Sequence, residues 1–318
     1  MPALYLTEDE VRDLMDMPAS IQVVEEAFRQ IGRGAVRNVP RARASAPGVV
    51  LHTMSAAAEY LGLVGWKAYT TTKAGARFHV AAYEADTGKM VALIEADYLG
   101  QLRTGATSGV ATEYMARPDA TLVGIFGTGL QARTQLEAVC HVRRVERVAA
   151  YGRDDERRRA FAEEMSRRCG TEVVPVHSPE EAGAEKDIVI GATTSKRPVF
   201  DGRGIEEGTH LNVVGSNYFA KSEIDVTTVR RADTLVCDSI EQCKIEAGDF
   251  REALELGVTD WALMRELADV VCGRETGRAR PEDITLFKSV GLAIEDVAMA
   301  AEIIKRARDA GVGQPLPF

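Results

Sequence analysis

The sequence has few of the features that mark metal sites, disulfide frameworks or membrane segments. Five cysteines are scattered over 318 residues without a C-x-x-C pair, and the five histidines show no spacing typical of metal ligands. We therefore expect no metal and no disulfide framework, and reduced cysteines of this kind favour a cytoplasmic protein. No apolar run approaches membrane-spanning length, and the opening MPALYLTEDEV lacks a charged leader before an apolar core, so no membrane partner is expected.

The charge pattern argues against a nucleic-acid partner. The formal net charge is −9, and no sustained basic tract stands apart from acidic neighbours. The arginines at positions 157–159 lie among acidic residues, which is typical of a solvated helix face. With 318 residues, the chain is long enough for two domains with separate cores.

The most informative segment is Thr121–Ala132, TLVGIFGTGLQA, in which apolar, β-favouring residues stop at a G-x-G-x-x-A motif. A strand that turns into a helix here places free backbone N–H groups and the positive helix end at one point, where a pyrophosphate can bind. An ordinary tight turn is the alternative, but the flanking strand and helix favour a dinucleotide site. The predicted cofactor-binding residues of the motif are Gly127, Thr128, Gly129, Leu130, Gln131 and Ala132.

Strands and helices alternate after this motif. The predicted strands are 145–151, 172–176, 187–192, 210–214 and 234–238, with helices over 154–168 and from Ser178. This alternation predicts an α/β fold with a parallel, doubly wound Rossmann sheet. Ligands of such sheets lie at the carboxyl ends of the strands, so Gly127–Ala132, Thr193–Ser195 and Gly215–Asn217 are expected to line one crevice.

The end of the second predicted strand bears on the choice of cofactor. NAD sites usually carry an acid there, which binds the ribose hydroxyls and repels a 2′-phosphate. Here the strand ends in Tyr151-Gly152-Arg153-Asp154, with glycine at the acid position and an arginine that can bind phosphate. NADP(H) is therefore slightly favoured. Asp154 leaves NAD(H) open, and Arg153 is otherwise one of several solvated arginines.

The remaining segments predict a smaller α+β domain. Helices are predicted after Thr7 and over 19–32, 101–115 and 290–310, and strands over 49–54, 64–71, 78–83 and 90–96. We expect one discontinuous domain over residues 1–118 and 292–318, and the Rossmann domain, over 119–291, inserted in it.

Several short segments carry a combined signature. They are Arg43 with Leu51–Met54, Gly65–Lys67, Ile94–Ala96, Leu102–Ala106, Gly127–Ala132, Gly215–Asn217 with Glu223–Asp225, and Ile284–Gly291. Together and in this order they resemble the ornithine cyclodeaminase/mu-crystallin family over essentially the whole chain. The resemblance implies an NAD(P)-binding Rossmann domain, chemistry on α-amino or α-imino acids, and a homodimer formed through the other domain, which also binds the substrate.

Three basic residues are candidates for catalysis. Hydride transfer to an α-carbon needs a fixed carboxylate and a proton donor at nitrogen. Arg43 and Arg103 match positions that hold the substrate carboxylate in the family, the alternative being salt bridges. Lys67, in the apolar segment LVGWKAY, matches the family's catalytic lysine. The alternative is a charged residue that protects an edge strand from pairing with other chains. In a dry pocket beside arginines, the pKa of Lys67 is expected to fall toward neutrality.

Asn217 departs from the family pattern. The matching residue is Asp in cyclodeaminases and in archaeal alanine dehydrogenase, whereas asparagine accepts no proton. The difference weakens a cyclodeaminase function but leaves imine reduction intact, because reduction needs no hydrolytic base there. Asn217 either hydrogen-bonds ribose or substrate, or belongs to an ordinary Gly-Ser-Asn turn.

Other residues are assigned to the edges of the site. Thr193 and Thr194 are expected beside the cofactor ribose together with Ser216, and Ser289 or the amides near Gly291 at the nicotinamide end. Lys288 is otherwise a surface residue. In the substrate domain, Arg41, Lys73 and Arg77 offer positive charge for a second carboxylate, the alternative being solvated loop charges.

The sequence thus favours an NAD(P)H-dependent reductase that converts an α-imino acid to the L-amino acid, with the dicarboxylic iminosuccinate as one candidate. The alternatives are an ornithine cyclodeaminase-type lyase, an alanine dehydrogenase-type enzyme, and a non-catalytic protein that binds the cofactor. Lys67 and Arg103 argue against the last, because a binding protein needs no proton donor.

Overall fold

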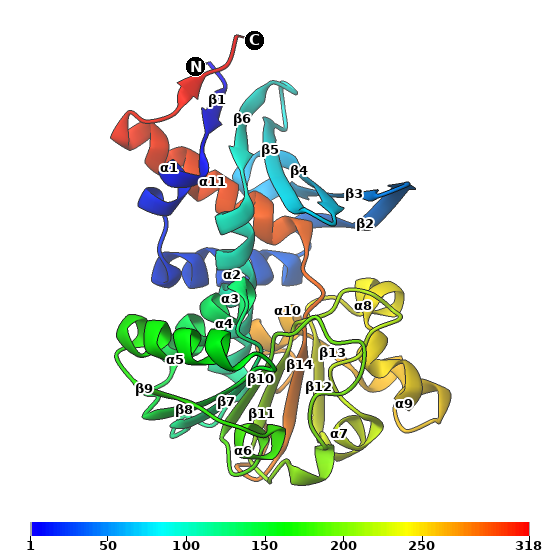
Figure 1. Cartoon of the computed structure of the whole chain (residues 1–318). Coiled ribbons are helices and arrows are strands. Elements are labelled where there is room, and N and C mark those ends of the chain that lie inside the picture. Colours follow the sequence, from blue (N-terminus) through cyan, green and yellow to red (C-terminus); the bar gives the residue numbers. More distant parts are fainter. Residues whose placement is uncertain (1, 318) are drawn as a thin grey trace. The chain divides into compact units, whose positions relative to one another are not determined.

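The computed structural model describes residues 2–317, and the chain divides into two compact units (Figure 1). Unit 1 combines the residues up to Arg103 with those from Leu292 onward, and unit 2 covers Thr104–Gly291. The first boundary differs from the expected one after residue 118, because helix α3 (Asp97–Met115) gives its first turns to unit 1 and the remainder to unit 2.

Unit 2 is built on a sheet that has eight strands in the described chain, and all its neighbouring strands are parallel. Their order is β13-β12-β14-β11-β10-β7-β8-β9. The strands are β7 (Leu122–Phe126), β8 (Arg147–Tyr151), β9 (Glu172–Pro175), β10 (Ile188–Gly191), β11 (His210–Val213), β12 (Thr234–Cys237), β13 (Arg265–Glu266) and β14 (Thr285–Lys288). The strand order reverses direction at β7 and β10, which is where doubly wound sheets bind ligands.

Several helices of unit 2 begin at a residue whose side chain caps them. Asp154, Ser178 and Asp225 each accept a hydrogen bond from a backbone N–H in the first turn of the helix that follows. The helices are α4 (Leu130–Val142), α5 (Asp155–Cys169), α6 (Pro179–Gly183), α7 (Val226–Arg231), α8 (Ile240–Glu246), α9 (Arg251–Glu255) and α10 (Leu267–Val271).

Two apolar clusters bury both faces of this sheet. One contains Ile125, Ala132 and Phe161, and the other contains Leu211 and Phe250. A parallel sheet needs such cover on both sides, since its strands are mainly apolar on both faces. The predicted Rossmann-type domain is confirmed.

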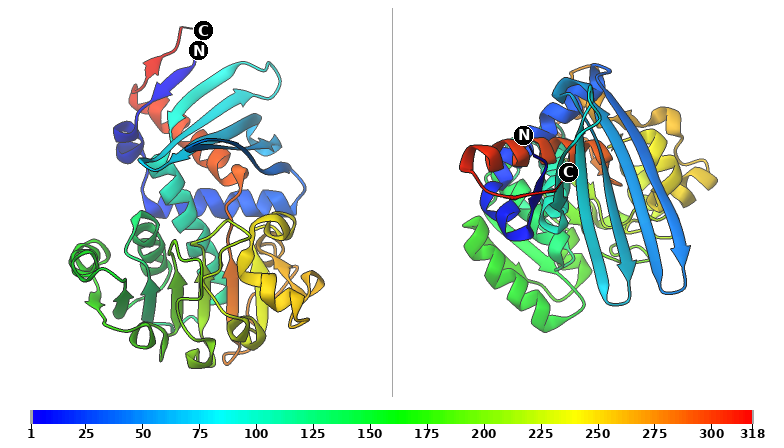
Figure 2. Two further views of the ribbon diagram at one scale, coloured as in Figure 1. Left: turned by 45° about the vertical axis from the view of Figure 1, so that its right-hand side comes forward. Right: turned by 90° about the horizontal axis from the view of Figure 1, so that it is seen from above.

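Unit 1 contains a mixed sheet of seven strands in the described chain, in the order β15-β1-β6-β5-β4-β3-β2. The strands are β1 (Leu4–Leu6), β2 (Val36–Ala46), β3 (Val49–Ala58), β4 (Leu63–Thr72), β5 (Gly75–Glu84), β6 (Met90–Glu95) and β15 (Gln314–Pro315). The helices of unit 1 besides α3 are α1 (Glu8–Leu14), α2 (Met17–Gly32) and α11 (Ala293–Ala310). Figure 2 shows β2–β6 side by side, and α11 packs across them.

The burial pattern of β4 decides which side chains face α11. Gly65, Lys67 and Tyr69 are buried, while the residues between them are only partly buried. At Gly65, an added Cβ would lie 2.9 Å from a methyl group of Val297 in α11, so this face is the one that the helix covers. The alternation therefore places Lys67 under α11.

Five strands of the described chain were not predicted from the sequence: the short β1, β13 and β15, and the longer β2 and β14. Strand β2 contains Pro40 and several arginines, and a register shift between Val39 and Ala42 accommodates the proline. Strand β14 lies between β11 and β12, although only a motif was assigned there. No helix within residues 2–317 combines the length and the apolar character that crossing a membrane requires.

Candidate active site

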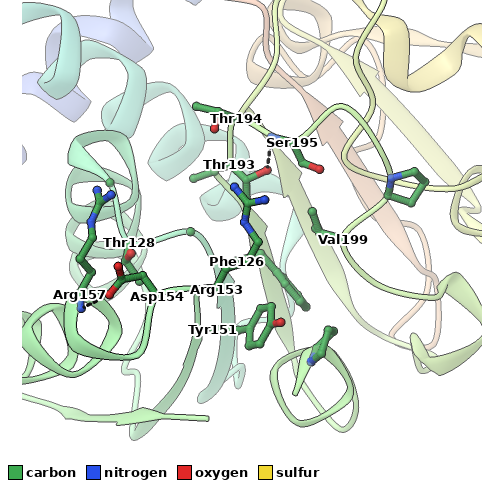
Figure 3. A pocket seen from close by; sticks show the side chains of 16 residues that line it. Phe126, Thr128, Tyr151, Arg153, Asp154, Arg157, Thr193, Thr194, Ser195 and Val199 are labelled. Atoms are coloured by element: carbon green, nitrogen blue, oxygen red, sulfur yellow. Dashed lines mark hydrogen bonds between the residues drawn. The ribbon is translucent and has the colours of Figure 1, made fainter. Parts of the chain in front are cut away.

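A cavity of about 430 Å³ lies in unit 2 at the carboxyl ends of β7, β8 and β10 (Figure 3). Its size falls within the usual range of ligand pockets. The lining residues are Phe126, Gly127, Thr128, Gly129, Tyr151, Gly152, Arg153, Asp154, Arg157, Pro179, Ala192, Thr193, Thr194, Ser195, Pro198 and Val199. A crevice is therefore present at the reversal of strand order, and Gly127–Gly129 and Thr193–Ser195 line it as expected. Gly215–Asn217, which were expected there too, are not among its lining residues.

The glycine-rich turn has the geometry that a bound pyrophosphate requires. Gly127 has φ +111°, and a Cβ on it would lie 2.3 Å from the carbonyl oxygen of Ala192, so only glycine fits. Around Gly129 nothing lies within 4 Å of an added Cβ, which leaves its backbone open to a ligand. Ala132 is fully buried in the helix–sheet core. The chain thus fits a dinucleotide at this turn.

Two arginines approach the part of the cavity that follows β8. Arg153 and Arg157 both line it. In Figure 3, Arg157 lies on the side of Thr128 and Asp154, and the Arg153 side chain lies between that side and Thr193. Asp154 caps α5 by accepting the N–H of Arg157 at 2.9 Å. At Gly152 an added Cβ would lie 2.9 Å from the Thr128 methyl group, so the acid of a typical NAD site has little room.

The other predicted cofactor residues occupy different positions. Leu130 is exposed and Gln131 half-buried in the first turn of α4, outside the lining of the cavity. Ser289 donates its hydroxyl hydrogen to Asp238 at 2.8 Å, and the Gly291 N–H donates to the same carboxylate at 2.7 Å. Asp238 therefore fixes both groups inside unit 2. Their contact with nicotinamide stays a prediction.

Sequence reasoning assigned no role to Glu223, which ties two strand ends together. Its carboxylate accepts the N–H of Thr193 after β10 and the N–H of Gly215 after β11, both at 2.6 Å. Burial raises the pKa of Glu223, and the nearby carboxylate of Asp249 raises it further. In the sequence, Glu223 is recognisable only as part of the family segment Glu223–Asp225.

Lys288 is fully buried beneath the same loops and is not a surface residue. It forms an ion pair with Asp249 at 2.8 Å and donates to the carbonyl of Ser216 at 2.8 Å. Burial lowers the pKa of Lys288, but the charges of Asp249 and Glu223 outweigh this and raise it. Ser216 is thereby fixed by its backbone, and Asn217 follows it, half-buried.

In unit 1, Lys67 lies on a central strand, because β4 pairs with β3 on one side and β5 on the other. The interpretation as a residue that protects an edge strand is therefore wrong. Its side chain is only 2 % exposed, and its ammonium bonds to Asp296 Oδ1 at 2.8 Å. On α3, a Cβ added to Gly100 would lie 3.0 Å from the Lys67 ammonium, so this glycine leaves room for the charge.

Two further basic side chains surround Lys67. Arg103 bonds to Glu295 Oε2 at 2.7 Å and lies 3.3 Å from Asp296 Oδ1, and Arg41 places its guanidinium 3.5 Å from the Met54 sulfur. Arg41 and Arg103 are both buried. Glu295 and Asp296 were not predicted from the sequence as site residues. Two adjacent acids in the first turn of a largely apolar helix are the pattern that could have indicated them.

The charges around Lys67 change its acidity. Burial lowers its pKa to about 8, with Asp296 opposing the change and Arg103 and Arg41 adding to it. The predicted direction is therefore confirmed. A lysine with this pKa exchanges its proton near neutral pH.

An aromatic row adjoins Lys67 on the same face of the sheet. His52 stacks on Tyr69 with 4.2 Å between ring centres, and Tyr69 stacks on Phe78 at 4.6 Å. The Lys67 ammonium lies 5.3 Å from the Phe78 ring centre. Half-buried Arg43 pairs with His52 in the sheet register and so belongs to this face.

Lys73 and Arg77 do not belong to this group. Arg77 pairs with Thr70, which alternation places on the opposite face of the sheet from Lys67. Lys73 is exposed in the turn after β4. Of the three residues expected to add positive charge beside Lys67, Arg41 is buried and acts on it, whereas Lys73 is exposed and strand pleating directs Arg77 away.

The family model named ornithine cyclodeaminase/mu-crystallin family matches residues 2–311. The chain belongs to this family. Its sequence is 37% identical to Thermococcus litoralis Δ1-pyrroline-2-carboxylate reductase, solved with NADH and L-proline, with a TM-score of 0.95 over 98% of this chain and 100% of that one. An archaeal alanine dehydrogenase dimer with bound NAD is 31% identical, with a TM-score of 0.94 and full coverage of both chains.

A third member of the ornithine cyclodeaminase/mu-crystallin family extends the range of substrates. The iminosuccinate reductase of Paracoccus denitrificans, solved with NAD⁺, is 25% identical, with a TM-score of 0.94 over the whole of both chains. The resemblance predicted from short segments is thus confirmed. The chain is an NAD(P)-dependent oxidoreductase of the class that acts on carbon–nitrogen bonds.

Replacing Glu223 by Gln is expected to weaken cofactor binding. A carboxamide has one acceptor oxygen, so it cannot hold both N–H groups, and the loops that follow β10 and β11 lose their common tie. We expect the Kd for NAD(P)H to rise about tenfold, the usual effect of one lost charge-assisted hydrogen bond. Fluorescence titration of the reduced cofactor measures it.

The exposed Glu241 of α8 provides a matched control. Glu241→Gln is expected to leave the cofactor Kd unchanged. A Glu223→Gln protein with lowered stability but an unaltered Kd would show that the tie serves folding alone.

Proposed function

We propose that this protein reduces an α-imino acid to the corresponding amino acid, with NAD(P)H as the hydride source. The observation that carries the proposal is Lys67, a buried lysine with a pKa near 8 and arginines beside it. Such a group suits transfer of a proton to nitrogen at neutral pH. The cavity at Gly127–Gly129 supports the cofactor part.

The balance of buried charge favours an anionic substrate. Arg41, Lys67 and Arg103 are buried cations, and Glu295 and Asp296 are the buried acids that contact them. This group carries one positive charge in excess, which a carboxylate neutralises. A guanidinium binds a carboxylate through two parallel hydrogen bonds, and Arg41, Arg43 and Arg103 are the candidates.

Each residue has a defined part in the proposed reaction. Bound reduced nicotinamide supplies the hydride. Reduction of a C=N bond leaves an electron pair on nitrogen, and Lys67 Nζ donates the proton that this pair takes up. The arginines fix the carboxylate, and the buried setting excludes water from the donor. Asn217 offers hydrogen bonds but no base, which favours reduction over a cyclodeaminase reaction.

We infer that a substrate with one carboxylate fits better than a dicarboxylate. The iminosuccinate hypothesis draws on Arg41, Lys73 and Arg77, but Lys73 is exposed and Arg77 lies on the opposite face of the sheet from Lys67. The Thermococcus litoralis relative, solved with NADH and L-proline, supports a cyclic imino acid such as Δ1-pyrroline-2-carboxylate. The Paracoccus denitrificans relative keeps iminosuccinate as the second candidate.

A homodimer is also proposed for this chain. The archaeal alanine dehydrogenase relative is a dimer. On the sheet of unit 1, Leu51 and Val64 are exposed on the face opposite Lys67, where a second copy would cover them. A cytoplasmic location stays a prediction from the cysteines.

Imino-acid reduction is tested by following NAD(P)H absorbance with a panel of substrates. We expect Δ1-pyrroline-2-carboxylate to be reduced faster than oxaloacetate with ammonia, pyruvate with methylamine, or ornithine with oxidised cofactor. A clear preference for oxaloacetate with ammonia would instead support iminosuccinate. Lack of turnover with every substrate would contradict the proposed function.

Two lysine variants control this experiment. Lys67→Met preserves side-chain length but removes the proton donor, so kcat is expected to fall by about 10²–10⁴. Cofactor affinity should be retained, because the cavity in unit 2 is unchanged. Lys73→Met removes an exposed lysine and is expected to keep full activity.

The pH profile follows from the state of Lys67. Its pKa is lowered to about 8, and reduction needs the protonated form. We expect kcat/KM for imine reduction to be level below about pH 8 and to fall about tenfold per pH unit above it. Initial rates, with cofactor binding measured at the same pH values, provide the test. If kcat/KM begins to fall only near the ordinary pKa of lysine, the result would contradict Lys67 as the proton donor.

NADP(H) is proposed as the preferred cofactor. Arg153 and Arg157 line the cavity after β8, and Gly152 replaces the acid that repels a 2′-phosphate. The relatives described above were solved with NADH, NAD and NAD⁺, so the proposal depends on these residues of this chain.

Arg153→Ala is expected to raise KM for NADPH about ten- to a hundredfold and to leave KM for NADH nearly unchanged, because only the former has a 2′-phosphate. Steady-state kinetics with both cofactors provide the comparison. Arg159→Ala, in the exposed part of α5, is the matched control and should change neither value. Equal losses with both cofactors would rule out a phosphate contact.

A further inference from the structure

One oxygen of Asp296 has no hydrogen-bond partner among residues 2–317. Asp296 is fully buried in the first turn of α11, and its Oδ1 atom is shared by Lys67 at 2.8 Å and Arg103 at 3.3 Å. The second oxygen, Oδ2, is equally buried but unpaired. Buried polar atoms are nearly always hydrogen-bonded, and a buried carboxylate oxygen most of all.

The position of Oδ2 suits a group that approaches Lys67. Any nitrogen that takes a proton from Lys67 Nζ must come within hydrogen-bond distance of it, about 3 Å. Nζ itself lies 2.8 Å from the Asp296 carboxylate, so that nitrogen also comes close to this acid. The neighbouring acid, Glu295, differs because it pairs with Arg103 instead of Lys67.

We propose that Asp296 Oδ2 accepts a hydrogen bond from the N–H of a bound iminium ion, so that Asp296 is a catalytic residue that recognises the substrate nitrogen. The inference rests on the proposed function and deepens it. One carboxylate then serves two partners: Oδ1 holds the proton donor, and Oδ2 holds the nitrogen that receives its proton.

The protons and electrons of the step balance. An iminium ion, C=N–H⁺, takes a hydride at carbon from the reduced nicotinamide, and the C=N π pair moves to nitrogen. The original hydrogen stays bonded to nitrogen and keeps its hydrogen bond to Asp296 Oδ2, while the new lone pair takes a proton from Lys67 Nζ. The product nitrogen leaves as an ammonium group, and neutral Lys67 regains a proton from water.

This arrangement selects substrates by their nitrogen. An N–H donor satisfies Oδ2, whereas an oxygen or other acceptor at the same place meets a buried anion and is repelled. A 2-oxo acid offers no N–H group there. The site should therefore discriminate between planar carboxylates that differ only in this atom.

Pyrrole-2-carboxylate and furan-2-carboxylate form such a pair. Both are flat five-membered rings with one carboxylate, but the first presents N–H and the second a ring oxygen. We expect the wild-type enzyme, saturated with NADPH, to bind pyrrole-2-carboxylate about ten- to a hundredfold more tightly, as measured by calorimetry. Similar affinities in the wild-type enzyme would overturn the proposal without any variant.

Asp296→Asn tests the residue itself. The asparagine carbonyl is expected to face the Lys67 ammonium, which leaves its NH₂ group, a donor, where Oδ2 was. The preference for pyrrole-2-carboxylate should then disappear or reverse. A variant that weakens binding of both ligands equally would indicate a structural role and contradict the proposal.

Glu295→Gln is the matched control at the adjacent position. It disturbs Arg103, so both carboxylates should bind more weakly while their ratio stays the same. The substrate panel separates the two hypotheses: imine reduction without the pyrrole preference contradicts only the role of Asp296. The pyrrole preference without imine reduction contradicts only the proposed function.

Discussion

The ion pair between Lys67 and Asp296 is the constraint on which unit 1 depends. An ammonium group removed from water costs several kcal/mol unless a counter-charge replaces the lost solvent. Lys67 faces inward on a central strand, so that counter-charge must come from the helix that covers the sheet. The acid pair in the first turn of α11 therefore joins that turn to Lys67 and Arg103. Gly100 provides the remaining space.

The two units provide different kinds of chemistry. Unit 2 presents backbone groups: the open amides near Gly129 and two strand ends held together by Glu223. Such a surface suits phosphate and sugar, which all nicotinamide cofactors share. Unit 1 presents side-chain charges on one face of a sheet, where Arg41 and Lys67 are buried. Binding of the shared parts of the cofactor thus depends on backbone groups, whereas recognition of the substrate depends on side chains.

The sequence predicts best where the relevant contacts are local. The turn at Gly127–Ala132 and the inward direction of Lys67 both follow from neighbouring residues. Contacts between residues far apart in the sequence could not be predicted. Lys67 and Asp296 are 229 positions apart, and Glu223 joins the loops that follow two different strands. Arg41, at the register shift in β2, is buried more deeply than Arg43, which the sequence favoured as the candidate. Strand β14 was missed because a lysine usually indicates a surface position. Lys288 is buried only because the distant Asp249 neutralises its charge.

The order of synthesis gives the placement of α11 a consequence for the nascent chain. Lys67 and Arg103 leave the ribosome well before Glu295 and Asp296 have been made. Unit 2 is continuous from Thr104 to Gly291 and has its whole core available at that stage. The strands of unit 1 must instead wait, with two unneutralised cations, until the final helix emerges. A chain arrested before residue 292 would thus contain all of unit 2 but would lack the helix that covers the sheet of unit 1.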